Sequence, residues 1–189
     1  MALAVAMALG LSGCGGGGGG NSGGGNVRPA PPATSSDISV EGGQVTVRPD
    51  TFSGSTSLVK NGAGTLTLTG ASSHTGGTTV NQGILQIGNG GTSGSIQGNV
   101  TNNASLVFNR SDDISFAGAV SGSGSLTQQG TGTLILTGAS TYTGGTMVNA
   151  GTLKLAAGAT LGAGDITVGD RRSSSNIDKI GRASCRERV

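Results

Sequence analysis

The sequence contains few aromatic and charged residues. Of its 189 residues, 2% are aromatic, 11% are charged and 33% are hydrophobic, and Trp is absent. A typical globular domain has roughly 45 to 50% apolar and about 25% charged residues. The low hydrophobic content argues against a conventional two-layer core, and the low charge argues against a charge-driven disordered chain. Without a basic stripe or an aromatic stacking platform, nucleic-acid binding is not expected.

Cysteine and histidine are too scarce to build a metal or disulfide site. The two cysteines, Cys14 and Cys185, lie near opposite ends of the chain, and His74 is the one histidine. This arrangement predicts neither a disulfide framework nor a metal centre, and no motif predicts a cofactor.

Glycine, in contrast, is abundant, with 39 residues. A strict Gly-X-Y period is missing, which excludes collagen. The composition is typical of an all-β chain made of short strands and glycine turns.

The strongest feature is an internal repeat. Residues 53–87 align without a gap on residues 121–155, at a constant shift of 68, with 22 of 35 positions identical. Apolar residues alternate with polar ones, which predicts strands with an inward apolar face and an outward Thr face. Three short strands in some thirty residues predict that each copy forms one coil of a β-solenoid. A β-sandwich is the alternative, but it does not need a near-identical copy at a fixed shift.

The segment between the copies has the same pattern of strands and turns. Residues 96–108 and 113–122 are expected to add a further coil or two. The interior is expected to depend on the inward-facing leucines Leu66, Leu68, Leu134 and Leu136.

The repeat motif also resembles a known family. Each copy reads Gly-x-Gly-Thr-Leu-x-Leu-Thr-Gly, then His or Tyr, Thr-Gly-Gly-Thr-x-Val-Asn-x-Gly-x-Leu, over residues 62–85 and 130–153. This pattern resembles the autotransporter-associated β-strand repeat of passenger domains secreted by the type V route. The resemblance implies a right-handed parallel β-helix at the cell surface, acting as a stalk and secretion-assisting repeat over residues 38–170. It also implies that the chain is a fragment of a parent with a C-terminal β-barrel translocator.

The beginning of the chain resembles a lipoprotein leader. Residues 1–11 are wholly apolar, and Leu11-Ser12-Gly13-Cys14 follows them. That tetrapeptide resembles the lipobox of bacterial lipoproteins, which implies a signal peptide over residues 1–13, lipidation of Cys14 and anchoring in the outer membrane. Residues 14–37 then form a flexible Gly/Pro-rich tether. The leader and its glycine tract resemble those of lipidated subtilisin-type autotransporters.

The last nineteen residues differ from the rest in charge. Residues 171–189 carry six basic and two acidic residues, whereas residues 1–170 carry five basic and seven acidic ones. The 68-residue pattern does not continue past Gly169. Residues 180–189 resemble one reading frame of a sequencing-adapter oligonucleotide, and a divergent basic tail is the alternative.

No catalytic constellation is recognisable. His74 occupies the position of Tyr142 in the second copy, which predicts a turn or outer-face residue and not a general base. Asp112 and Asp113 are adjacent and are expected to point apart. The chain is therefore predicted not to be an enzyme. Two alternatives to a stalk stay open: a non-catalytic remnant of a subtilisin-type serine protease autotransporter, and an adhesin whose Thr-rich outer face binds a host or matrix surface.

Overall fold

The structure is a computed structural model that describes residues 35–169 and 176–179, all of which belong to one compact unit, residues 32–189. Within these residues the regular structure is entirely β-strand. The strands are β1 (Ser35–Ser39), β2 (Val45–Arg48), β3 (Ser57–Asn61), β4 (Thr65–Leu68), β5 (Thr78–Val80), β6 (Ile84–Ile87), β7 (Val100–Asn102), β8 (Ser105–Phe108), β9 (Ile114–Phe116), β10 (Val120–Ser121), β11 (Ser125–Gln128), β12 (Thr133–Leu136), β13 (Thr146–Val148), β14 (Thr152–Leu155), β15 (Ile166–Val168) and β16 (Asn176–Lys179).

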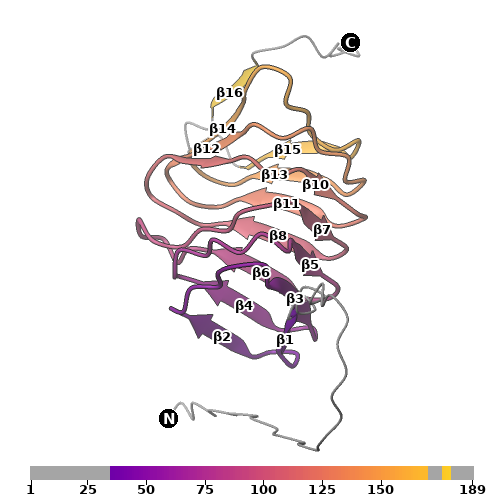
Figure 1. The fold of residues 1–189 in the computed structure, drawn as a ribbon. Coiled ribbons are helices and arrows are strands. Elements are labelled where there is room, and N and C mark those ends of the chain that lie inside the picture. Colours follow the sequence, from indigo (N-terminus) through magenta and orange to yellow (C-terminus); the bar gives the residue numbers. More distant parts are fainter. Residues whose placement is uncertain (1–34, 170–175, 180–189) are drawn as a thin grey trace, which may run out of the picture. The chain divides into compact units, whose positions relative to one another are not determined.

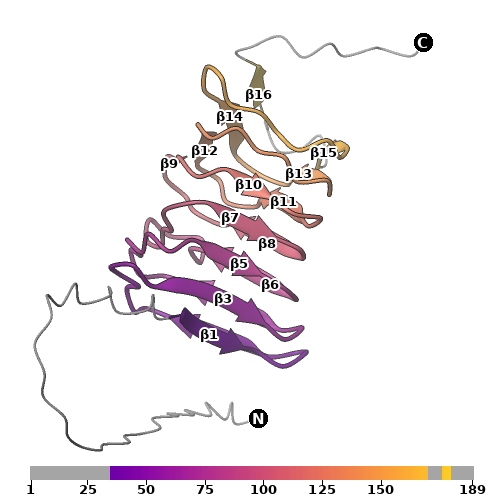
Figure 2. The same ribbon diagram turned by 45° about the vertical axis from the view of Figure 1, so that its right-hand side comes forward.

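These strands form three parallel sheets. The first sheet has the order β1-β3-β5-β7-β10, the second β15-β13-β11-β8-β6-β4-β2, and the third β16-β14-β12-β9. Figure 1 shows the strands of the second sheet stacked in chain order from β2 to β15, and Figure 2 shows β1, β3, β5 and β7 of the first sheet one above another. The seven strands of the second sheet mark seven coils, so the predicted parallel β-solenoid is confirmed.

The predicted coil length of about thirty residues is wrong. Residues paired between neighbouring strands are 19 to 22 positions apart in every pair except β14–β16. One copy of the repeat therefore spans nearly two coils. The first copy supplies β3 and β5 to the first sheet and β4 and β6 to the second, because its strands alternate between two faces of the same stack.

The 68-residue period moves each copy to the next face of the solenoid. Three coils of pairing lead from Leu58 through Thr78 and Val100 to Val120 in the first sheet. Leu126, the repeat equivalent of Leu58, lies six residues further on, in the second sheet. The second copy accordingly occupies the second and third sheets, with β11 and β13 in one and β12 and β14 in the other.

The interior is mainly apolar. Leu66, Leu68 and Leu134 are fully buried, and Leu136 is nearly so, as the alternation predicts. Phe108 and Phe116 pack against each other with ring centroids 5.6 Å apart. Because the strands pair in register, inward leucines stack on one another, as Leu66 of β4 does on Leu85 of β6.

Glycines bring the turns of successive coils close together. Gly62 has a φ of +74°, and a Cβ there would collide with the backbone carbonyl of Val40. At Gly132 there is no room for a side chain, because the Asp112 carbonyl lies where a Cβ would be. The turns around these glycines lead into strands β4 and β12, so they have no helix N-terminus for a phosphate group.

The first coil is more polar inside than those that follow. Thr46 and Arg48 of β2 pair with the inward-facing Leu66 and Leu68 of β4. Arg48 forms an ion pair with Asp50 at 2.6 Å, and its guanidinium lies 6.0 Å from the ring centroid of Phe52. The coil therefore places polar groups at two inward positions, a feature that we did not expect because the repeat does not include β2.

The two ends of the solenoid differ from the expected boundaries. β1 begins at Ser35, within the expected tether, and β16 lies within residues 171–189 and pairs with β14. Cys14, the expected signal peptide and the adapter-like residues 180–189 lie outside the described residues.

Candidate functional site

The interior of the solenoid contains several polar side chains, which are candidates for a binding or catalytic role. Within residues 35–169 and 176–179, no group of His, Cys, Asp and Glu has the arrangement of a metal site. The same residues include no helix that is long and apolar enough to cross a membrane.

Lys60 is a buried cation that binds backbone carbonyls. It lies on β3 at an inward position and is fully buried. Its Nζ donates hydrogen bonds to the carbonyl oxygens of Asn61 at 2.7 Å, Gly62 at 2.6 Å and Gln82 at 3.1 Å. Burial lowers the pKa of the Lys60 ammonium. The three carbonyls replace water around the ammonium and tie β3 to the turn of the next coil.

Gln128 has the same role in the second copy. It is the repeat equivalent of Lys60 and is nearly fully buried. Its Nε2 donates to the carbonyl oxygens of Gly130 at 2.9 Å and Gly132 at 3.0 Å, whereas its Oε1 has no hydrogen-bond partner in the described part of the chain. A long polar side chain that donates to turn carbonyls is therefore a shared element of both copies.

His74 is not a turn or outer-face residue as the sequence predicts, because its ring is fully buried. It lies on the irregular segment 69–77 between β4 and β5. Its Nε2 is 2.9 Å from Thr78 Oγ1, and its Nδ1 has no partner among the described residues. The ring packs edge-on against Phe52, with centroids 6.1 Å apart. Burial lowers the pKa of His74.

Tyr142 fills the equivalent position of the second copy. It is also fully buried, and its hydroxyl lies 2.5 Å from Thr146 Oγ1, as His74 Nε2 lies beside Thr78. Burial raises the pKa of Tyr142, although the contact with Thr146 opposes this. Both rings thus fill the solenoid where a face has no strand, which explains why the repeat tolerates either residue.

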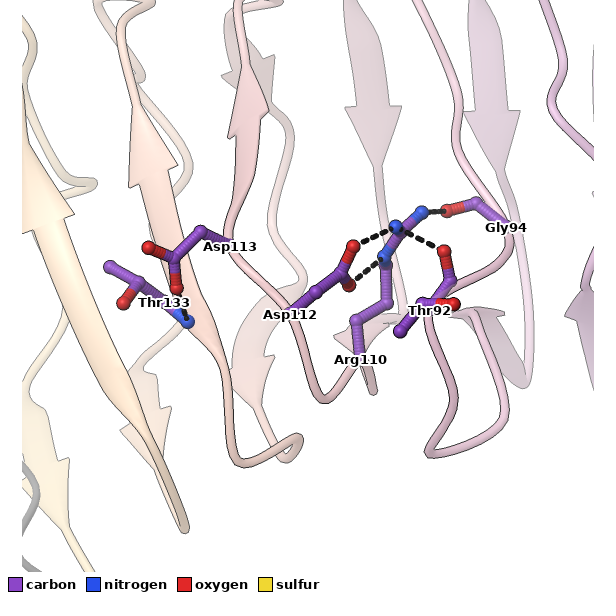
Figure 3. Close-up of polar contacts among 6 residues, drawn as sticks. All are labelled: Thr92, Gly94, Arg110, Asp112, Asp113 and Thr133. Atoms are coloured by element: carbon purple, nitrogen blue, oxygen red, sulfur yellow. Dashed lines mark hydrogen bonds and ion pairs between the residues drawn. The ribbon is translucent and has the colours of Figure 1, made fainter.

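An outer cluster surrounds Arg110. The guanidinium donates to the carbonyls of Thr92 and Gly94 and forms an ion pair with Asp112 at 2.6 Å (Figure 3). The hydrogen bond from Arg110 lowers the pKa of Asp112. Asp113 points elsewhere and accepts a hydrogen bond from the Thr133 amide at 3.0 Å. The two carboxylates therefore do not form an acid–base pair, as expected, and the cluster fastens the loop of residues 88–95 to the next coil.

One shallow hollow lies on the outer side of the first sheet. It has a volume of about 300 Å³ and is lined by residues 75–79, Asn99 and Thr101. The lining carries hydroxyl and amide groups, no charged side chain and no aromatic ring. Such a surface could contact a neutral polar ligand, but it supplies no group for catalysis.

The repeat alone could have indicated the buried polar positions. Lys60 follows Leu58 by two residues, so strand alternation places both on the inward face. The same reasoning applies to Thr78 and Val80. His74 was not predictable in this way, since it lies outside the strands and has no alternating neighbours.

Comparison with known proteins identifies the repeat. The passenger-associated-transport-repeat matches residues 58–87 and again 126–155. The adhesin BmaC autotransporter of Brucella suis biovar 1 (strain 1330) is 42% identical over 116 residues, covering 47% of this chain and 3% of that protein. The chain thus spans a very small part of the curated relative that it matches. No solved structure matches the chain.

The described residues form a parallel β-solenoid that contains two matches to the passenger-associated-transport-repeat.

Proposed function

We propose that this segment is a structural stalk that extends an autotransporter passenger from the cell surface. The observation that carries the proposal is the solenoid itself, in which repeated residues such as Leu66 and Leu134 fill the interior and Gly64 and Gly132 bring the turns of successive coils together. Seven coils at a strand spacing of about 4.8 Å give a column of roughly 30 Å. The relative that is named an adhesin autotransporter supports the assignment to a passenger.

The proposal includes a location and a means of attachment. The passenger repeat supports display at the outer membrane, with a C-terminal barrel translocator in the parent protein. Lipidation of Cys14 would tether the segment to the membrane through residues 14–37. Several acyl chains anchor firmly, whereas a single one does so only marginally.

An adhesin is the second candidate. The relative's name and the polar hollow beside Thr79 and Thr101 favour it. In that case the segment would not only extend the passenger, and its outer face would itself contact a host or matrix surface. The segment is proposed to be non-catalytic in both cases, because His74 is buried against Thr78, Asp112 is paired with Arg110, and Asp113 accepts from the Thr133 amide.

Exchange of the segment in the parent gene separates the two candidates. One strain carries residues 38–169 deleted, and another has them replaced by an unrelated parallel solenoid of seven coils. For a stalk, the replacement restores surface display and cell adhesion that the deletion impairs. Restored display without restored adhesion would favour the adhesin, and display unaffected by the deletion would contradict the stalk.

A further inference from the structure

The buried His74 has a different chemistry from the buried Tyr142 that replaces it. In either neutral tautomer one nitrogen is satisfied, because Nε2 lies 2.9 Å from Thr78 Oγ1, which can accept or donate, whereas Nδ1 has no partner among the described residues. Imidazolium carries a hydrogen on both nitrogens. Protonation would therefore place a donor and a positive charge in an apolar site with no acceptor for the new N–H.

The surroundings of the ring offer no compensating charge. Phe52 packs against the imidazole ring. The guanidinium of Arg48, itself a cation, lies 6.0 Å from the ring centroid of Phe52. Asp50 is ion-paired with Arg48. On the neighbouring strand β3, Lys60 is a second cation, with its Nζ engaged by three carbonyls. Burial of the ring therefore disfavours imidazolium, and these groups supply no acceptor that would offset it.

We propose that His74 is an acid-sensitive position of the solenoid, at which protonation below about pH 6.5 opens the N-terminal coils while the coils around Tyr142 stay closed. Opening can be local because each coil contacts only its neighbours. The segment that carries His74 is attached to the preceding coil by Ser73 N–H to Phe52 C=O at 2.7 Å and Thr75 N–H to Gly54 C=O at 2.8 Å.

The direction of the effect follows from proton linkage. Burial lowers the pKa of His74 in the folded chain, so the open state binds more protons between that pKa and about 6.5. The stabilising effect of the neutral ring is complete above pH 6.5 and decreases as the pH falls. The opening equilibrium is expected to rise by up to tenfold per pH unit in this window.

The second copy supplies a matched internal control. The amides of Ser73, Thr75 and Thr78 have exact equivalents in Thr141, Thr143 and Thr146, and all six donate to backbone carbonyls. Hydrogen-exchange protection factors of the full chain, measured at pH 7 and pH 5, should fall only in the first set. Carboxylates titrate mainly below this range, and the sequence has one histidine, so His74 dominates the titration.

Two exchanges between the copies test the assignment. His74→Tyr should abolish the fall in the first set, and Tyr142→His should produce a fall in the second set. NMR titration of the single imidazole in the wild-type chain should give a midpoint below pH 6.5. This measurement tests the proposal even if a variant fails to fold. A midpoint at or above 6.5, an equal fall in both sets, no fall in either, or a fall that His74→Tyr leaves unchanged would overturn the proposal.

Discussion

Replacement of Lys60 tests whether its buried ammonium supports the turn carbonyls. In Lys60→Met the aliphatic part of the side chain remains, but the carbonyls of Gly62 and Gln82 lose the donor that the structure gives them. The Asn61 carbonyl keeps a second donor, the amide of Val40 at 3.0 Å. Two turn carbonyls thus lose this donor, one on the half-buried Gly62 and one on the exposed Gln82.

The expected loss can be worked from these two carbonyls. A fully buried acceptor that loses its partner costs about 1 to 3 kcal/mol, and water can partly replace the donor at Gly62 and Gln82, so the two together cost about 2 kcal/mol. Removal of the buried charge acts in the opposite direction, because the ammonium no longer has to be desolvated. We therefore expect Lys60→Met to lower the free energy of unfolding by up to about 2 kcal/mol.

Lys60→Gln is the matched control, because it installs the residue that the second copy uses. Gln128 donates to two turn carbonyls, so Lys60→Gln should lower the free energy of unfolding by only about 1 kcal/mol. Urea unfolding of the full chain at pH 7, followed by circular dichroism, measures both variants. The reasoning fails if Lys60→Met is as stable as the wild type or if Lys60→Gln is the less stable of the two.

Three further outcomes are expected. Gly118→Ala should lower stability by at least about 3 kcal/mol in a thermal melt, because the new Cβ would meet the Gly98 carbonyl. Gly91→Ala is the control and should change stability little, because a Cβ there has open space. Equal melting temperatures of the two variants would contradict this. Arg110→Lys should speed hydrogen exchange of the loop 88–95 without shifting the global melt, since a lysine lacks the planar guanidinium; unchanged exchange would refute it. Cys14→Ser should abolish incorporation of radiolabelled lipid and release the chain from the membrane fraction; retention of both would rule out lipidation there.

The fold class followed from the sequence because strand alternation and an ungapped repeat carry strong local information. Leu66 and Leu68 are buried as their spacing predicts. The coil length did not follow, because alternation shows which residues point inward but not which strand lies above which. Strand pairing here joins Leu58 with Thr78, and no short-range pattern distinguishes that partner from one ten residues later.

The burial of His74 could not be predicted from the repeat either. Replacement of His74 by Tyr142 in the repeat excluded a shared catalytic role, but it gave no information about burial. An outer position and an interior position that accommodates either ring are equally compatible with that exchange. The contacts that decide the matter, Phe52 with the ring and Thr78 with its nitrogen, come from different coils.

The mismatch between the repeat and the coil bears on the choice between a stalk and an adhesin. Thr79 faces outward on the first sheet, and its repeat equivalent, Met147, lies on the second sheet. Equivalent outer residues therefore wind around the column and do not form one flat face. A ligand that binds one face would therefore not meet the equivalent outer residues of both copies there, whereas both copies contribute equally to the interior. The matching residues are also mainly those that pack or turn, such as Leu66 with Leu134 and Gly64 with Gly132. Both observations favour a repeat that preserves the column, and they support the stalk over an adhesive face made by the two copies together.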